Sequence, residues 1–205
     1  MIWAIVVAAG SGTRYGGPKQ LDSLDGRRLV DWAVEQPRAV ADGVVLVVPA
    51  DRMSEDWPEV DRLVPGGATR SESVRAGLVA VPDDAEVVVV HDAARPGAPK
   101  VLFDEVIAAL HGGGADGAVP GLAVPDTLRH LDGLSVDRDR VVAVQTPQAF
   151  RASVLRAAHA DDPQATDDAT LVERAGGRVV VVPGSPQAMK VTTKEDLRVL
   201  EALRA

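Results

Sequence analysis

Apolar residues in this chain gather in short continuous runs rich in Val and Ile, and helix-like segments separate those runs. Continuous runs, unlike strict alternation, favour strands that are covered on both faces, as in a mainly parallel sheet. The alternation of strands and helices predicts an α/β three-layer sandwich. The pattern predicts strands over 2–8, 44–48, 86–90, 117–123, 140–145 and 178–182, and helices over 29–35, 71–81, 99–111, 152–158, 168–175 and 194–204.

Capping residues mark several helix ends. Thr193 precedes an acidic first turn, so we expect it to be an N-cap residue, and Thr166 is a fair N-cap candidate for the helix over 168–175. The glycine pair 176–177 favours the end of that helix. The sequence shows no internal repeat and no linker, so we expect one domain over 1–205.

One polar segment, 124–139, interrupts the alternation of apolar runs and helix-like segments. Asp132 and Gly133 lie at its middle, and Asp-Gly between extended stretches is a β-hairpin signal. Two interpretations remain open: a surface hairpin without a role, or an arm that leaves the sheet and contacts a partner subunit.

Composition narrows the class of protein. The 205 residues are 46% hydrophobic but only 3% aromatic, and the absence of cysteine excludes disulfides and thiolate metal sites. A net charge of -8 argues against nucleic acid as a partner. No signal-peptide pattern and no apolar stretch of about 20 residues is present, so we expect no membrane association and a cytoplasmic location. Only four of the 22 basic residues are lysines, namely Lys19, Lys100, Lys190 and Lys194.

A glycine-rich segment, A-A-G-S-G-T-R-Y-G-G-P-K-Q over 8–20, follows the first predicted strand. Ligands of parallel sheets bind outside the carboxyl ends of strands, and a glycine turn can direct backbone N–H groups at phosphate oxygens. The dinucleotide pattern fails because Tyr15 holds the position of its third glycine. The Walker pattern fails because Pro18 precedes Lys19 and Gln20 replaces Ser or Thr.

Five further blocks contain polar residues near strand or helix ends. Taken alone, each has a structural explanation: a helix cap at Ser71, an Asp92–Arg95 ion pair, or a solvated Lys190 before the last helix. The blocks are G-G-A-T-R-S-E-S-V over 66–74, H-D-A-A-R-P over 91–96, T-P-Q-A-F over 146–150, T-D-D-A over 166–169 and K-V-T-T-K-E-D-L over 190–197.

These blocks occur in one order over nearly the whole chain, and the set resembles the 2-C-methyl-D-erythritol 4-phosphate cytidylyltransferase family. The resemblance implies a nucleotide-diphospho-sugar transferase fold with a Rossmann-like sheet. It also implies transfer of a cytidylyl group from CTP to a polyol phosphate in the non-mevalonate isoprenoid pathway, with Mg²⁺ as cofactor. Some members carry a second enzyme domain, which we do not expect in this chain.

The resemblance also implies the roles of particular residues. Arg14, Lys19 and Lys190 would stabilise charge on the reacting phosphates, and Asp92 is a candidate magnesium ligand. The arm would supply Thr127 and Arg138 to a neighbouring subunit, which implies a homodimer. The implied nucleotide contacts are Ala8, Ala9, Gly10, Ser11, Gly12, Gly67, Arg70, Ser73, Asp92 and Ala93, and the implied acceptor contacts are Asp92, Arg95, Thr127, Arg138, Thr146 and Lys190.

Two departures from the family pattern keep alternatives open. Only four residues separate Arg14 from Lys19, a shorter spacer than usual, and Ala188 stands near the place where the family commonly has Asn or Asp. The alternative to Arg138 as a phosphate contact is an ion pair with Asp137 or Asp139. The alternative functions are a ribitol-5-phosphate cytidylyltransferase and a catalytically silent nucleotide-binding protein.

Overall fold

The computed structural model describes residues 1–204, which form one eight-stranded sheet with the strand order β10-β7-β11-β6-β1-β4-β5 and β12 paired to β7. Strand β1 pairs in parallel with β4 and β6, as do β4 with β5 and β7 with β12. Strands β10 and β11 run antiparallel to their neighbours. The sheet strands are β1 (Ile2–Val7), β4 (Gly43–Val48), β5 (Arg62–Pro65), β6 (Val87–Asp92), β7 (Gly117–Ala123), β10 (Val142–Val144), β11 (Gln148–Arg151) and β12 (Val179–Pro183).

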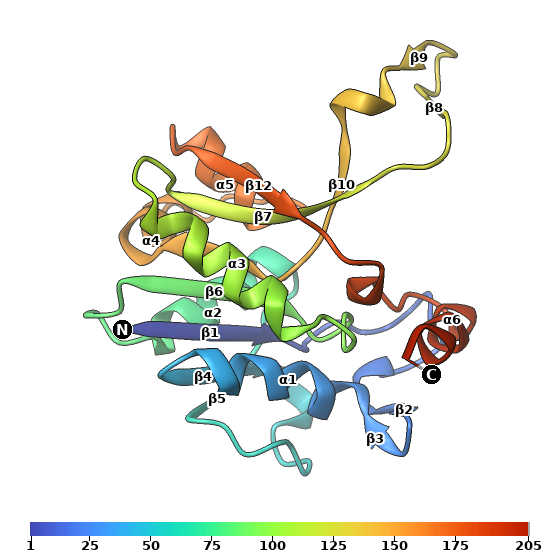
Figure 1. Cartoon of the computed structure of the whole chain (residues 1–205). Coiled ribbons are helices and arrows are strands. Elements are labelled where there is room, and N and C mark those ends of the chain that lie inside the picture. Colours follow the sequence, from blue (N-terminus) through green and yellow to red (C-terminus); the bar gives the residue numbers. More distant parts are fainter. Residues whose placement is uncertain (205) are drawn as a thin grey trace.

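Helices cover both faces of the sheet, which confirms the three-layer sandwich (Figure 1). Alternate residues of β1 show why: Ala4 and Val6 belong to the core beneath α1 and α3, whereas Trp3 and Ile5 belong to the core beneath α2, α4 and α5. Both faces of the central strands are therefore apolar, which accounts for the uninterrupted hydrophobic runs. The helices are α1 (Leu29–Val40), α2 (Arg70–Ala80), α3 (Lys100–His111), α4 (Ala152–Ala158), α5 (Asp168–Arg174) and α6 (Lys194–Arg204).

A third, smaller core joins α6 to the glycine-rich segment. Tyr15 and Val191 pack there with Leu24, Leu29 and Leu200, all of them buried. This cluster brings α6 and the residues before it beside the segment that follows β1. The short elements nearby and elsewhere are the strand pair β2 (Ser23–Leu24) and β3 (Arg27–Arg28) and the 3-10 helices η1 (Lys19–Leu21), η2 (Ala50–Arg52), η3 (Arg138–Arg140) and η4 (Pro186–Ala188).

The predicted arm is present and projects away from the sheet (Figure 1). Strands β8 (Leu128–Arg129) and β9 (Ser135–Val136) pair antiparallel, and Gly133 adopts a φ of 95° in the turn between them. Leu131 and Leu134 at its tip are exposed. A hairpin that projects into solvent and carries exposed leucine side chains is suited to contact another protein surface.

Some predicted bounds were wrong. The segment 140–145 forms a strand only over Val142–Val144, and β5 and β11 were missed because each carries charged or polar residues at its ends. Helix α1 continues past the predicted end, because Pro37 is buried and its packing offsets the lost backbone hydrogen bond. Among residues 1–204, no helix has the length and apolar character that a membrane crossing requires.

The capping predictions were confirmed at two places and wrong at two. Thr193 accepts a hydrogen bond from the Asp196 N–H, and Gly176 ends α5 with a φ of 86°. The N-cap of α5 is Asp167, not Thr166, because its carboxylate accepts from the Thr170 N–H at 3.1 Å. The N-cap of α2 is Thr69, not Ser71. In both cases the capping residue lies one or two positions from the expected one.

Candidate active site

The glycine-rich segment leaves β1 and folds into a tight loop. The N–H groups of Tyr15, Gly16 and Gly17 all donate to the carbonyl of Gly12 at 2.9–3.2 Å. Gly12 has a φ of 66°, and a methyl group there would lie 1.8 Å from the Gly17 carbonyl oxygen. The loop therefore requires glycine at position 12.

Tyr15 anchors this loop to the protein. Its ring is buried in the cluster with Val191 and Leu200, and its hydroxyl donates to Asp22 at 2.6 Å. Burial and this carboxylate raise the pKa of Tyr15 well above its usual value. The short spacer between Arg14 and Lys19 is thus a rigid turn with its own side-chain anchor.

Lys19 follows that turn and faces the other end of the chain. Its Nζ donates to the carbonyl of Val191 at 2.8 Å, a contact across 172 residues. Burial lowers the pKa of Lys19, and the positive charges of Lys190 and Arg14 lower it further, although Asp92 opposes them. Three cations therefore lie near one another, an arrangement that suits a polyanionic ligand.

The second glycine turn, 66–69, leads into α2 at the neighbouring strand end. Ser73 accepts a hydrogen bond from the Gly67 N–H at 3.2 Å and donates to the Thr69 carbonyl at 2.9 Å. A methyl group on Gly66 would lie 2.4 Å from the Cβ of Ala9. The two glycine turns are therefore in direct contact, and side chains larger than hydrogen would separate them.

Asp92 ends β6 and is the centre of the charged network. Its Oδ1 accepts from the Arg70 Nε at 3.0 Å, and its Oδ2 accepts from the Lys190 Nζ at 2.7 Å. Burial alone would raise the pKa of the Asp92 carboxyl, but the Arg70 and Lys190 cations hold it well below its usual range. Asp92 is therefore ionised across the physiological range, and Lys190, although exposed, is held by an ion pair with it.

The expected alternative of an Asp92–Arg95 ion pair was wrong. Arg95 closes the turn only by its backbone N–H, which donates to the Asp92 carbonyl at 2.9 Å. Its guanidinium donates instead to the carbonyls of Ala188 at 2.7 Å and Val144 at 3.3 Å. Burial lowers the pKa of Arg95. The main chain at Ala188 thus supplies a contact that needs no polar side chain at that position.

A cavity of about 800 Å³ opens at the carboxyl edge of β1, β4 and β6. Most of the predicted nucleotide and catalytic residues line it, which brings the separate sequence blocks together at one place. Among the predicted residues, those lining it are Ala8, Ala9, Gly10, Ser11, Lys19, Gly67, Arg70, Ser73, Asp92, Ala93 and Lys190.

A smaller cavity of about 220 Å³ adjoins the first and shares Arg70, Asp92 and Lys190 with it. The predicted acceptor contacts Arg95 and Thr146 line this second cavity. Two neighbouring spaces that share three charged residues are suited to hold two reactants next to each other.

Four predicted residues do not line either cavity. Gly12 accepts the hydrogen bonds that close the loop, and Arg14 is exposed on the same loop. Thr127 and Arg138 are exposed on the arm and line neither cavity. Arg138 donates to the Pro125 carbonyl and lies 3.9 Å from Asp139, so the alternative ion pair exists only as a long contact.

Sequence reasoning missed other lining residues. The segment 49–52, which follows β4, forms one wall of the larger cavity. Gln145, Gln148, Thr166 and Asp167 line the smaller one. The segment 49–52 and Gln145 follow β4 and β10, and this position was the available signal because ligands of such sheets bind at strand ends. The other three lie in the T-P-Q-A-F and T-D-D-A blocks.

His91 makes stability depend on pH. It is buried, its Nδ1 lies 3.1 Å from the Thr146 Oγ1, and burial lowers the pKa of His91 to about 4. The unfolded chain, with a pKa near 6.5, binds the proton first, so stability is lost as the pH falls from about 6.5 to 4.

We expect this histidine to cost the ligand-free protein about 3 kcal/mol of unfolding free energy over that pH range. Urea unfolding at several pH values measures it. His91→Gln should flatten the slope, whereas His111→Gln, on the exposed end of α3, should not. Equal slopes in His91→Gln and the unchanged protein would contradict the assignment.

Solved structures share this fold closely. The cytidylyltransferase from Thermus thermophilus has a TM-score of 0.85 and 36% identity, with all of both chains covered. The bifunctional IspDF from Campylobacter jejuni has a TM-score of 0.84 and 30% identity, covering 97% of this chain and 54% of its own. The fold and the cavity at its sheet edge thus define a nucleotidyltransferase.

The family follows from the sequence comparisons. The family model described as "IspD: 2-C-methyl-D-erythritol 4-phosphate cytidylyltransferase" matches residues 2–204. A protein of that name from Nocardia farcinica is 44% identical over 98% of this chain and 92% of its own. A bifunctional IspD/IspF enzyme from Clavibacter michiganensis is 43% identical, but this chain spans 54% of its length. The chain belongs to the 2-C-methyl-D-erythritol 4-phosphate cytidylyltransferase family, as the motifs predicted.

Proposed function

We propose that this chain transfers the cytidylyl group of CTP to 2-C-methyl-D-erythritol 4-phosphate and releases pyrophosphate. An acceptor phosphate oxygen forms a bond to the α-phosphorus of CTP as the bond from that phosphorus to the bridging oxygen breaks. The observation that carries the proposal is the meeting of Lys19, Lys190 and Asp92 at one cavity between two glycine turns. The family membership supports the choice of both substrates.

The cytosine and ribose are proposed to lie against the two glycine turns. Small residues there let the backbone approach a ligand, and the first N–H groups of α2 face the same edge. Ala8 to Ser11 and Gly67 with Ser73 would form the walls of this part of the cavity. Backbone groups can read the N4 donor and O2 acceptor of cytosine.

The chemical work assigned to the protein is electrostatic. Charge grows on the α-phosphate and on the leaving pyrophosphate, and fixed cations stabilise it without reorganisation. Lys19 and Lys190 already face the cavity and are held in place by the Val191 carbonyl and by Asp92. Arg14 lies outside the cavity lining but close enough to lower the pKa of Lys19, so it would reach the phosphates from the loop.

A magnesium ion is part of the proposal. Within residues 1–204, no three His, Cys, Asp or Glu side chains gather closely enough to hold a metal by themselves. Mg²⁺ that travels with a triphosphate needs only one or two carboxylates, and the ionised Asp92 at the cavity provides one. Bound there, the ion would neutralise charge on the phosphates.

The acceptor is assigned to the smaller cavity, with its phosphate held by the arm of a second chain. Arg95 and Thr146 line that cavity, while Thr127 and Arg138, on the arm of the same chain, do not. A homodimer that exchanges arms would complete the site. Exposed apolar side chains on and beside the arm support such an interface: Leu131, Leu134, Val142, Val144 and Val181.

Arg138→Ala tests this arrangement. We expect the KM for the acceptor to rise at least about tenfold, because a bidentate phosphate contact is lost, while CTP binding by calorimetry stays within about twofold. Arg129→Ala removes a cation from the same arm and is the matched control. Equal effects of the two substitutions, or no change in KM, would contradict the role of Arg138.

The proposed function is tested with CTP, MgCl₂ and either acceptor, with pyrophosphate release as the measurement. A kcat/KM higher for methylerythritol phosphate than for ribitol 5-phosphate supports the proposal, and the reverse favours the alternative enzyme. CTP binding without pyrophosphate release from either acceptor would make the chain a silent nucleotide-binding protein. The proposed location is the cytoplasm, where nucleoside triphosphates are available.

A further inference from the structure

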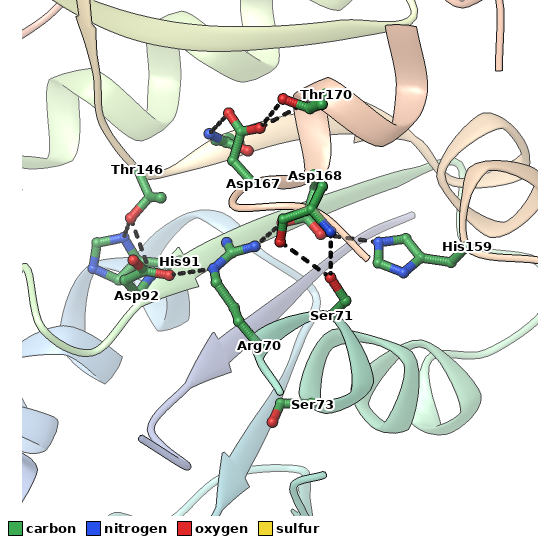
Figure 2. A network of polar contacts seen from close by, with 12 residues as sticks. Arg70, Ser71, Ser73, His91, Asp92, Thr146, His159, Asp167, Asp168 and Thr170 are labelled. Carbon is green, nitrogen blue, oxygen red and sulfur yellow. Dashed lines mark hydrogen bonds and ion pairs between the residues drawn. The ribbon is translucent and has the colours of Figure 1, made fainter. Parts of the chain in front are cut away.

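A line of side chains runs from the cavity into the protein interior; cations and carboxylates alternate along it, and a histidine is its last member. It begins with the ion pair of Lys190 and Asp92. It continues from Asp92 through Arg70 to Asp168 and His159 (Figure 2). The Nη1 of Arg70 donates to the Asp168 Oδ2 at 2.8 Å, and the Asp168 Oδ1 lies 2.9 Å from the His159 Nε2. We call these five residues the charge relay.

The inner end of the charge relay is buried and lies outside both cavities. Asp168 is 0% exposed and His159 is 4% exposed. Asp168 is the first residue of α5, His159 follows α4, and Arg70 is the first residue of α2. Burying these charges costs free energy that the hydrogen bonds offset only in part, so a simple packing role explains them poorly.

Each carboxylate in the charge relay divides its two oxygens between two different partners. Asp92 gives Oδ1 to Arg70 and Oδ2 to Lys190, and Asp168 gives Oδ2 to Arg70 and Oδ1 to His159. A guanidinium frequently binds both oxygens of one carboxylate. Arg70 instead gives its Nε to Asp92 and its Nη1 to Asp168, and its Nη2 has no hydrogen-bond partner in the part of the chain that the structure describes, so one bond on each side fixes the orientation of the guanidinium.

We propose that Asp168 and His159 are positioning residues for catalysis. By holding Arg70 between two carboxylates, they keep the Oδ2 of Asp92 directed at Lys190 and at the reacting groups. His159 does the same for Asp168 by occupying the oxygen that Arg70 would otherwise bind. The inference rests on the proposed cytidylyl transfer and adds two residues that touch neither substrate.

The test is a double-mutant cycle with Asp168→Asn and Asp92→Asn. We expect Asp168→Asn to lower kcat about tenfold or more, with the KM for CTP within about twofold, because Arg70 is then held less firmly and can turn its unpartnered Nη2 toward the Asp92 Oδ2. Added to Asp92→Asn, it should cause no further loss, because the charge relay acts only through Asp92. The proposal would be overturned if the kcat losses of the two single variants multiplied in the double variant, or if Asp168→Asn left kcat unchanged.

Two further variants separate positioning from folding. Ser71→Ala removes a buried hydroxyl next to Arg70 that hydrogen-bonds the Ala165 backbone at 3.3 Å. It therefore weakens the contact between α2 and the segment before α5 but leaves every residue of the charge relay unchanged. Its kcat should stay within about twofold. At His159, Gln keeps an N–H donor and should retain kcat within about threefold, whereas Leu should lose about fivefold or more. Equal kcat values for the two His159 variants would count against the proposal, and this pair decides the matter if Asp168→Asn does not fold.

Failure of the proposed function is recognised separately. If the unchanged protein releases no pyrophosphate from either acceptor, the proposed cytidylyl transfer is wrong. The double-mutant cycle of Asp92 and Asp168 is then measured by the shifts in thermal unfolding midpoint. Because Asp92 and Asp168 share Arg70, their shifts should not add. Additive shifts would show that the two carboxylates do not communicate and would end the inference.

Discussion

Lys19→Ala should lower kcat by at least about tenfold, and by about a hundredfold if Lys19 makes its full contact only in the transition state. The Nζ of Lys19 lies at the cavity, fixed by the Val191 carbonyl at 2.8 Å. Charge that develops on the phosphates would meet a cation that is already in place. The KM for CTP should change less than kcat, because the loss falls on the transition state rather than on the bound substrate.

Steady-state pyrophosphate release with varied CTP measures both constants. Lys100→Ala is the matched control, since Lys100 lies on the exposed start of α3 and pairs with Asp104. Its kcat should equal that of the unchanged protein. If Lys19→Ala turned over within twofold of the unchanged chain, the role assigned to Lys19 would be wrong.

The fold was predictable where burial dominates the sequence. Strands β1, β4, β6 and β7 are apolar on both faces, so their runs of Val and Ile identified them. Strand β11 lies inside the sheet but is only four residues long and is polar at both ends. Its antiparallel pairing with β6 and β7 decides its conformation. Tertiary pairing of this kind leaves no local signal.

The sequence predicted which residues belong to the candidate site, but not which of them form ion pairs with each other. The motifs placed Asp92, Lys19 and Lys190 at strand and loop ends, and the structure brings them to one cavity. Sequence proximity suggested Arg95 as the partner of Asp92, whereas the partners are Arg70 and Lys190, 22 and 98 positions away. His159 carried no signal at all, because a lone histidine after a short helix is usually structural.

The same ion pairs make Asp92→Asn the substitution with the broadest effect. Asparagine preserves the shape but removes the negative charge that Arg70 and Lys190 share. We expect kcat to fall about a hundredfold, because Lys190 loses its anchor and the proposed magnesium ion loses its carboxylate. Stability at pH 7 should fall by about 3 kcal/mol, because a partly buried guanidinium and ammonium lose their counter-charge.

The pH dependence identifies the cause of that stability loss. The folded-state pKa of Asp92 lies below its unfolded value, so its carboxylate stabilises the fold above about pH 4 and ceases to do so as the pH falls further. The difference between Asp92→Asn and the unchanged protein should therefore shrink below pH 4. Urea unfolding at pH 7 and pH 3.5 measures it, with Asp104→Asn, in the exposed Lys100–Asp104 pair, as the control that should cost about 0.5 kcal/mol or less. Equal costs for the two substitutions at pH 7 would show that the Arg70–Asp92–Lys190 arrangement contributes no more than a surface ion pair, and Asp92 would then not be the electrostatic centre of the site.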